Sequence, residues 1–135
     1  MQFKIDGILE VTKVVTKYDY HIATGNKLNI AKEFAVKLQG TFVYDDIGGK
    51  IIRASYPRMS LYYAPWGSMF TPFISNVSTS FPIINSTATA VTFKGSYEMM
   101  GTFTAFIKGF PIGTTESYGS YQINFTATPS SPSNM

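Results

Sequence analysis

The sequence predicts an all-β protein: a single-domain antiparallel β-sandwich or barrel, with at most one short helix near residues 29–39. Three observations indicate this class. Apolar residues alternate with polar ones at period two, the second half combines Ser and Thr with aromatic residues, and turn residues separate the runs. With 135 residues, 44% of them hydrophobic, the chain suits one domain with a single core.

The charged residues lie mostly in the first half of the chain. Residues 1–58 hold nine Lys and Arg and six Asp and Glu, whereas residues 59–135 hold two of each class. Ser and Thr take their place, together with most of the aromatic residues. β-Branched and aromatic side chains fit the half-buried surface of a sheet, so we expect strands throughout the second half.

The first strands are predicted near the N-terminus, where one change of pattern interrupts the alternation. Apolar residues share one parity up to Val11 and the other parity from Val14 to Tyr20. A one-residue slip of this kind predicts a bulge or a break around Thr12–Lys13. The segment 29–39 suits either a strand containing Phe34, Val36 and Leu38 or a short helix begun by Asn29, and the alternation favours the strand.

Turn residues predict where the strands end. Hairpins are expected at 24–27, 45–50 and 110–114, and the two prolines and one glycine of 64–73 predict a long loop. Later strands are expected at 91–99, at 103–107 after a bulge or bend at Gly101, and at 121–127. The β domain should cover residues 1–128. The Pro/Ser-rich tail 129–135 should be extended or mobile in the isolated protein.

The inventory of chemically active residues is small. Without cysteine there is no disulfide, thiolate metal site or thiol nucleophile. His21 is the single histidine, and Asp19 on the same strand face could orient it, although a surface imidazole is the favoured interpretation. Asp45 and Asp46 before Gly48 predict a turn in which an aspartate bonds its own backbone. We therefore expect no metal, no cofactor and no enzymatic activity.

Two short segments resemble parts of known families. Phe3–Val15 followed by Phe34–Phe42 resembles the first strands of an OB-fold, which implies a single-stranded nucleic-acid binder. Tyr44–Ile51 resembles hairpins of allene-oxide-cyclase-type barrels, which implies a small-molecule-binding β-barrel with possible enzymatic activity. The basic residues of the first half fit a nucleic-acid groove, but six acids dilute them and most nearby rings have the parity of core residues. Nucleic-acid binding is disfavoured.

The densest aromatic cluster is the predicted contact site. If these rings are exposed, they could stack on a carbohydrate or dock on another protein, and if they point inward they plug one end of the sheets. The cluster consists of Tyr62, Tyr63, Trp66, Phe70 and Phe73.

The preferred function is a non-enzymatic structural subunit of a larger homo-oligomeric particle such as a virion, a phage tail or a fibre. A β domain that stays alone needs charges on its edges and surface, and the second half has few. Its partners would be copies of itself or other structural subunits. The alternatives are a small-molecule-binding barrel, then an adhesin or lectin, then the nucleic-acid binder. The sequence shows no membrane span and no secretory signal, which predicts synthesis in the cytoplasm and a final location in a virion or another extracellular particle.

Overall fold

A computed structural model of the chain describes residues 3–5, 8–24 and 31–135. In these residues the chain forms β-strands and turns, and no helix. The first four strands are β1 (Phe3–Ile5), β2 (Ile8–Thr24), β3 (Ala31–Asp45) and β4 (Ile51–Tyr63). They are followed by β5 (Phe70–Thr79), β6 (Ile83–Ile84), β7 (Val91–Ile107) and β8 (Phe110–Ala127). The predicted all-β class is therefore confirmed.

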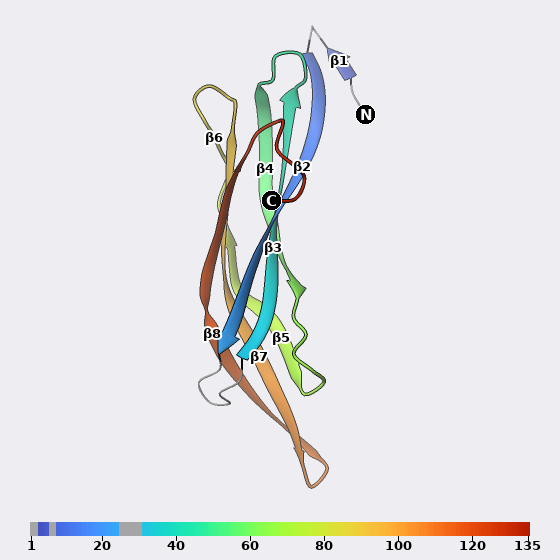
Figure 1. Cartoon of the computed structure of the whole chain (residues 1–135), viewed down its shortest axis with the longest axis vertical. Helices are drawn as coiled ribbons and strands as arrows, with labels where there is room; N and C mark the ends of the chain where they lie inside the picture. The colour runs from blue at the N-terminus through green and yellow to red at the C-terminus, as the bar shows by residue number, and fades with distance from the viewer. Residues whose placement is uncertain (1–2, 6–7, 25–30) are drawn as a thin grey trace.

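The strands form two antiparallel sheets that face each other. The N-terminal sheet has the order β1-β2-β3-β4. In the C-terminal sheet, β7 is central, with β8 along one side and β5 and β6 along the other. Figure 1 shows an elongated molecule in which the β7–β8 hairpin extends well beyond the other strands.

Alternating residues of both sheets fill the space between them. From the N-terminal sheet, Val15, Phe34, Val36, Leu38 and Phe42 are buried. The C-terminal sheet contributes alternate residues from 91–99 of β7 and from 123–127 of β8, with Tyr121 partly buried, which confirms the alternation predicted for 91–99 and 121–127. These residues are Val91, Phe93, Tyr97, Met99, Ile123, Phe125 and Ala127.

The predicted bulge near Thr12 is wrong. β2 pairs with β3 without a register shift from Glu10 to Thr24, so alternation continues unbroken along the strand. Val14 and Tyr20 consequently point outward and are exposed. The sequence pattern changes parity because four positions on the inner side of the strand are polar or charged, not because the strand slips; these are Lys13, Lys17, Asp19 and His21.

The ambiguous segment 29–39 is a strand over the part that the structure describes. β3 begins at Ala31 and pairs with β2 on one side and β4 on the other. Asn29, the proposed helix start, lies outside the described residues, as does most of the predicted turn at 24–27.

One predicted hairpin turn is confirmed and another lies elsewhere. Residues 46–48 form the turn after β3, and the Asp45 carboxylate accepts a hydrogen bond from the Ile47 amide at 3.0 Å, as predicted. The β7–β8 hairpin, however, turns at Lys108–Gly109 and not at 110–114. Both residues have positive φ, 52° and 82°, and such a two-residue turn matches the twist of the strands it joins.

Glycines in the C-terminal sheet have roles that differ from the expected one. Gly101 was expected at a bulge, but it pairs regularly with Pro72 and Glu116. The register shift lies in β8 beside Gly119, whose φ is 108°. Gly101 instead leaves room for an indole ring, because a Cβ there would come within 2.5 Å of the Trp66 side chain.

The predicted loop at 64–73 is shorter than expected. Residues 64–69 are irregular, and β5 begins at Phe70 and includes Pro72. β5 is an edge strand, where a proline is tolerated because no neighbouring strand needs its missing N–H group.

Candidate interaction surfaces

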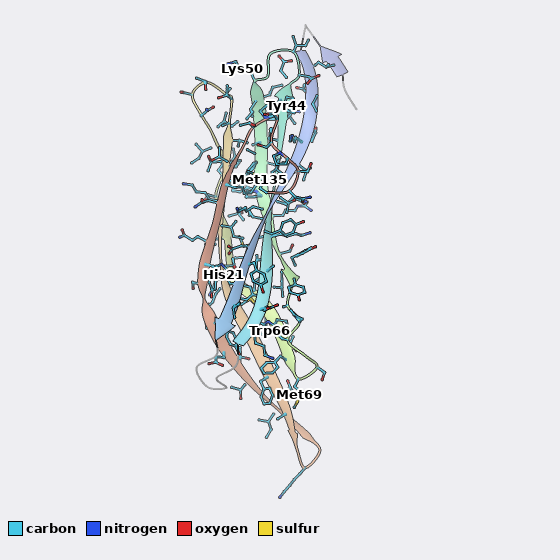
Figure 2. All side chains as sticks on the ribbon, in the orientation of Figure 1. His21, Tyr44, Lys50, Trp66, Met69 and Met135 are labelled. Carbon is cyan, nitrogen blue, oxygen red and sulfur yellow. The ribbon has the colours of Figure 1, made fainter. Side chains whose placement is uncertain are left out.

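The predicted aromatic cluster is divided between the interior and the surface. Trp66 is only 2% exposed and donates its indole Nε1 to the Glu33 carbonyl oxygen at 2.6 Å. Its ring packs edge-on against Tyr118, with ring centroids 5.0 Å apart. Figure 2 shows Trp66 between His21 and the end of the β7–β8 hairpin. The indole therefore closes part of the core and offers no stacking surface to a sugar.

Phe70 and Phe73 lie on opposite faces of β5. Phe70 packs on Phe103 with ring centroids 5.1 Å apart, and the Lys32 ammonium lies 4.4 Å from its ring centroid. Phe73 alternates with it and is exposed. Only Phe73 of this pair is presented to solvent as a contact residue.

Tyr62 and Tyr63 are exposed, and the fold brings two further tyrosines to them. Tyr20, Ala35 and Tyr63 lie in one row across β2, β3 and β4. Tyr18 contacts Tyr62, with ring centroids 4.8 Å apart. We call Tyr18, Tyr20, Tyr62 and Tyr63 the tyrosine patch; the exposed fractions are 52% for Tyr20, 59% for Tyr62 and 45% for Tyr63.

Charged groups border the tyrosine patch on β3. The Lys37 ammonium lies 5.9 Å from the Tyr62 ring centroid. Partial burial and a hydrogen bond with the Glu33 carboxylate raise the pKa of the Tyr20 hydroxyl. Aromatic rings with hydroxyl tips and a few ions around them have the composition of a protein contact surface.

Sequence reasoning had assigned Tyr18 and Tyr20 to the core. The signal that identifies them as surface residues is the unbroken parity that runs from Val11 through Val15 to Ala23, all on the inner face. Continued along β2, this parity puts every even-numbered residue outside.

The second surface is the outer edge of β8. Within the described part of the chain, the backbone of β8 pairs with β7 alone, although the strand is 18 residues long. Its one charged residue is Glu116. Edge strands of isolated proteins are usually short or protected by Lys, Pro or bulges, and the section Ser120–Ala127 has no Lys, no Pro and no register shift.

The outer face of the C-terminal sheet is coated with hydroxyl and amide groups. Threonine hydroxyls meet across β7 and β8 in two places, Thr92 with Thr126 at 2.9 Å and Thr102 with Thr115 at 3.0 Å. Lys94 is the one cation of β7 on this face. Most of the charge-poor half of the sequence thus forms one sheet, on one side of the molecule.

A polar group inside the sandwich joins the two sheets. The Tyr97 hydroxyl donates to Asp19 Oδ2 at 2.9 Å, and His21 Nε2 lies 2.7 Å from the same oxygen. The His21 ring packs at a tilt of 34° against Tyr121, with ring centroids 4.2 Å apart. Asp19 does contact His21, the alternative that was disfavoured against a surface imidazole, and Tyr97 binds the same carboxylate from the other sheet.

The surroundings of this polar group raise the pKa values of the two neighbouring tyrosines, Tyr97 and Tyr121. Burial, followed by the hydrogen bond to Asp19, raises the pKa of Tyr97 far above its ordinary value. Burial and then the Asp19 charge also raise the pKa of Tyr121. Both hydroxyls hold their protons at neutral pH and act as hydrogen-bond donors, while the two rings pack against each other.

Two pockets lie against strand surfaces, and both open to solvent. One, of about 140 Å³, is lined mainly by polar residues of β5, β7 and β8, including Lys94 and Gln122. The other, of about 320 Å³, lies on β3 and β4 beside Tyr56 and Arg58.

In the described parts of the chain, no three His, Asp or Glu residues group as metal ligands. The same residues include no helix long and apolar enough to cross a membrane.

Comparison of the chain with family models, with curated proteins and with solved structures finds no significant match.

Proposed function

We propose that this protein is a structural subunit that assembles with copies of itself into a larger particle, as in a virion, a phage tail or a fibre. The single observation that carries the proposal is the open edge of β8. A row of backbone N–H and C=O groups along a strand with a single charged residue accepts another strand readily, because each new pair satisfies both backbones.

The charge distribution supports assembly through this edge. Two copies that pair their β8 edges antiparallel are related by a two-fold axis. Each Glu116 then lies opposite an uncharged residue of the other copy, unless the two-fold axis passes through Glu116 itself. No repulsion opposes such pairing elsewhere along the strand. The hydroxyl groups of the adjoining face add hydrogen bonds without the desolvation penalty of ions.

The tyrosine patch supports a particle larger than a dimer. It lies on the outer face of the N-terminal sheet, whereas the β8 edge belongs to the C-terminal sheet. A subunit that has two separate contact surfaces can bind two neighbours, and repeated use of such contacts builds rings or filaments.

The first experiment measures the mass of the protein in solution at micromolar concentrations. We expect oligomers whose proportion rises with concentration. A protein that remains a monomer at about 100 μM, far above the concentrations at which stable interfaces form, would overturn the proposal.

The second experiment separates the edge from the face. Gln122→Lys places a cation on β8, and Ser96→Lys places one on the neighbouring position of the central strand β7, on the same outer face. Assembly through the edge predicts that Gln122→Lys weakens association much more than Ser96→Lys. An equal loss of association in both variants points to contact through the outer face of the sheet. Unchanged association in both variants contradicts a role of the C-terminal sheet in assembly.

A further inference from the structure

We propose that the open edge of β2 around Thr16 is a strand-addition site that accepts segment 129–135 of a second copy of the chain. In this structure the chain's own segment occupies the site. The exchange between copies rests on the proposed assembly function, whereas the acceptor site itself does not.

The occupied site is built from main-chain contacts. The Thr16 amide donates to the Ser133 carbonyl oxygen at 2.7 Å, and the Met135 amide donates to the Thr16 carbonyl oxygen at 2.8 Å. Thr16 and Asn134 form a parallel bridge. Lys13 Nζ also donates to the Pro129 carbonyl oxygen at 2.8 Å. The segment expected to be extended or mobile turns at residues 129–131 and is docked on β2 through Ser133, Asn134 and Met135.

The geometry of β2 explains why this edge can bind a strand. In an antiparallel pair, the backbone groups of alternate residues point toward the partner and away from it. Both backbone groups of Thr16 bond to segment 129–135, so they point away from β3. The same alternation gives Thr12, Val14 and Tyr18 outward backbone groups, and β1 pairs with β2 only at residues 8–10.

The segment is held weakly, which allows exchange. Ser130 and residues 132–135 are exposed, and none of the large fully buried side chains comes from 129–135. The segment begins with a short turn, in which the Ser131 amide donates to the Thr128 carbonyl oxygen at 3.0 Å. A change at this turn would release the segment from its own β2 without disturbing the core.

Figure 2 shows Met135 beside β2, about midway along the molecule. The segment leaves β8 at Ala127 and crosses to the other sheet. A neighbouring subunit bound along the sandwich can therefore supply an equivalent segment to the same edge.

The first test uses a chain that ends at Thr128 and an acetylated, amidated peptide of residues 128–135. We expect saturable binding by calorimetry or fluorescence. A peptide N-methylated at Met135 lacks the amide that donates to the Thr16 carbonyl oxygen. The protein variant Thr16→Pro lacks the amide that donates to the Ser133 carbonyl oxygen. Each change should weaken binding of the peptide about tenfold or more. Thr12→Pro is the matched control, because its outward amide has no contact with the segment. Absence of binding, or equal effects of the two proline variants, overturns the acceptor site.

The second test uses the full chain, which has no native cysteine. One chain has Thr16→Cys and another has Asn134→Cys, and the two are mixed and oxidised. Exchange predicts a disulfide-linked heterodimer, and a partner chain with Asn85→Cys, on an exposed loop, should not form one. If only the double variant Thr16→Cys, Asn134→Cys cross-links, within a single chain, the exchange is wrong.

The outcomes separate the two proposals. Peptide binding by a protein that remains a monomer at all concentrations supports the acceptor site and contradicts the assembly function. Oligomers that form without peptide binding or heterodimer cross-links support the assembly function and contradict the acceptor site.

Discussion

The Tyr97 hydroxyl donates a hydrogen bond to the Asp19 carboxylate at 2.9 Å and thereby connects β7 to β2 across the core. The two sheets thus share a polar contact at the margin of the core, where the Asp19 side chain is 22% exposed. His21 approaches the same carboxylate oxygen at 2.7 Å, so the oxygen keeps one partner if the other is removed.

Tyr97→Phe should lower the free energy of unfolding by about 1–2 kcal/mol, because it removes a hydrogen bond to a carboxylate while leaving the ring packing in place. Urea denaturation measures the change. Tyr56→Phe, at a tyrosine that is 59% exposed, is the control and should have almost no effect. Equal stability of Tyr97→Phe and the wild type would show that Tyr97 contributes only its ring.

Stability should fall as the pH rises above about 10. The folded state raises the pKa of the Tyr97 hydroxyl above its ordinary value of 10.0, mainly through burial. Unfolded Tyr97 therefore loses its proton first, and the unfolded state is favoured from that pH upward. Denaturation curves between pH 8 and pH 11 measure the loss. Tyr97→Phe should show a smaller decline, with the remainder due to Tyr20, Tyr118 and Tyr121, whose pKa values burial also raises.

The sequence was sufficient to predict the strands in which one face is apolar. Residues 121–127 alternate cleanly, and of their inward positions Ile123, Phe125 and Ala127 are buried and Tyr121 is partly buried. The Asp45 turn was also predictable, because a short acceptor side chain before glycine stabilises a local turn that depends on no distant partner.

Contacts between distant residues were not predictable in the same way. The polar residue Asp19 on the inner face of β2 is explained by its contact with Tyr97, which is 78 residues away along the chain. Tyr18 and Tyr20 were assigned to the wrong face because that partner was not visible. The docking of 129–135 likewise depends on an open edge of β2, and no property of a Pro/Ser-rich segment reveals such an edge.

Gly101→Ala should lower the free energy of unfolding by about 1–3 kcal/mol, the usual effect of forcing an extra methyl group into a packed core. The added Cβ would meet the rigid Trp66 ring at 2.5 Å and the Tyr118 ring at 3.1 Å. Gly113→Ala is the matched control, since its Cβ would lie 3.6 Å from Thr102 in ordinary contact. Thermal denaturation followed by tryptophan fluorescence compares them, and equal melting temperatures would contradict the close approach of Trp66.

Asp45→Asn should destabilise the protein at neutral pH, and the difference from the wild type should shrink below about pH 4. The Ile47 amide, with a smaller contribution from the Leu9 amide, holds the pKa of the Asp45 carboxyl below its ordinary value. As the pH falls, the unfolded state therefore takes up the proton first and the wild type loses this stabilisation. Urea midpoints at pH 7 and pH 3 measure both differences. A constant difference would show that the amide bonds do not depend on the charge.

Tyr62→Ser should weaken self-association while leaving the stability of the fold almost unchanged. The side chain is 59% exposed and contacts Tyr18, so its loss removes little from the core but removes a large ring from the tyrosine patch. Central aromatic residues of an interface often contribute 2 kcal/mol or more, so we expect the dissociation constant to rise at least about tenfold. Tyr56→Ser removes an equally exposed ring from the same strand, outside the patch, and should change association little. Sedimentation velocity over a concentration series measures both variants. Equal weakening of association in both variants would mean that any exposed ring contributes, wherever it lies on the strand. No weakening in Tyr62→Ser would exclude the tyrosine patch as a contact between copies.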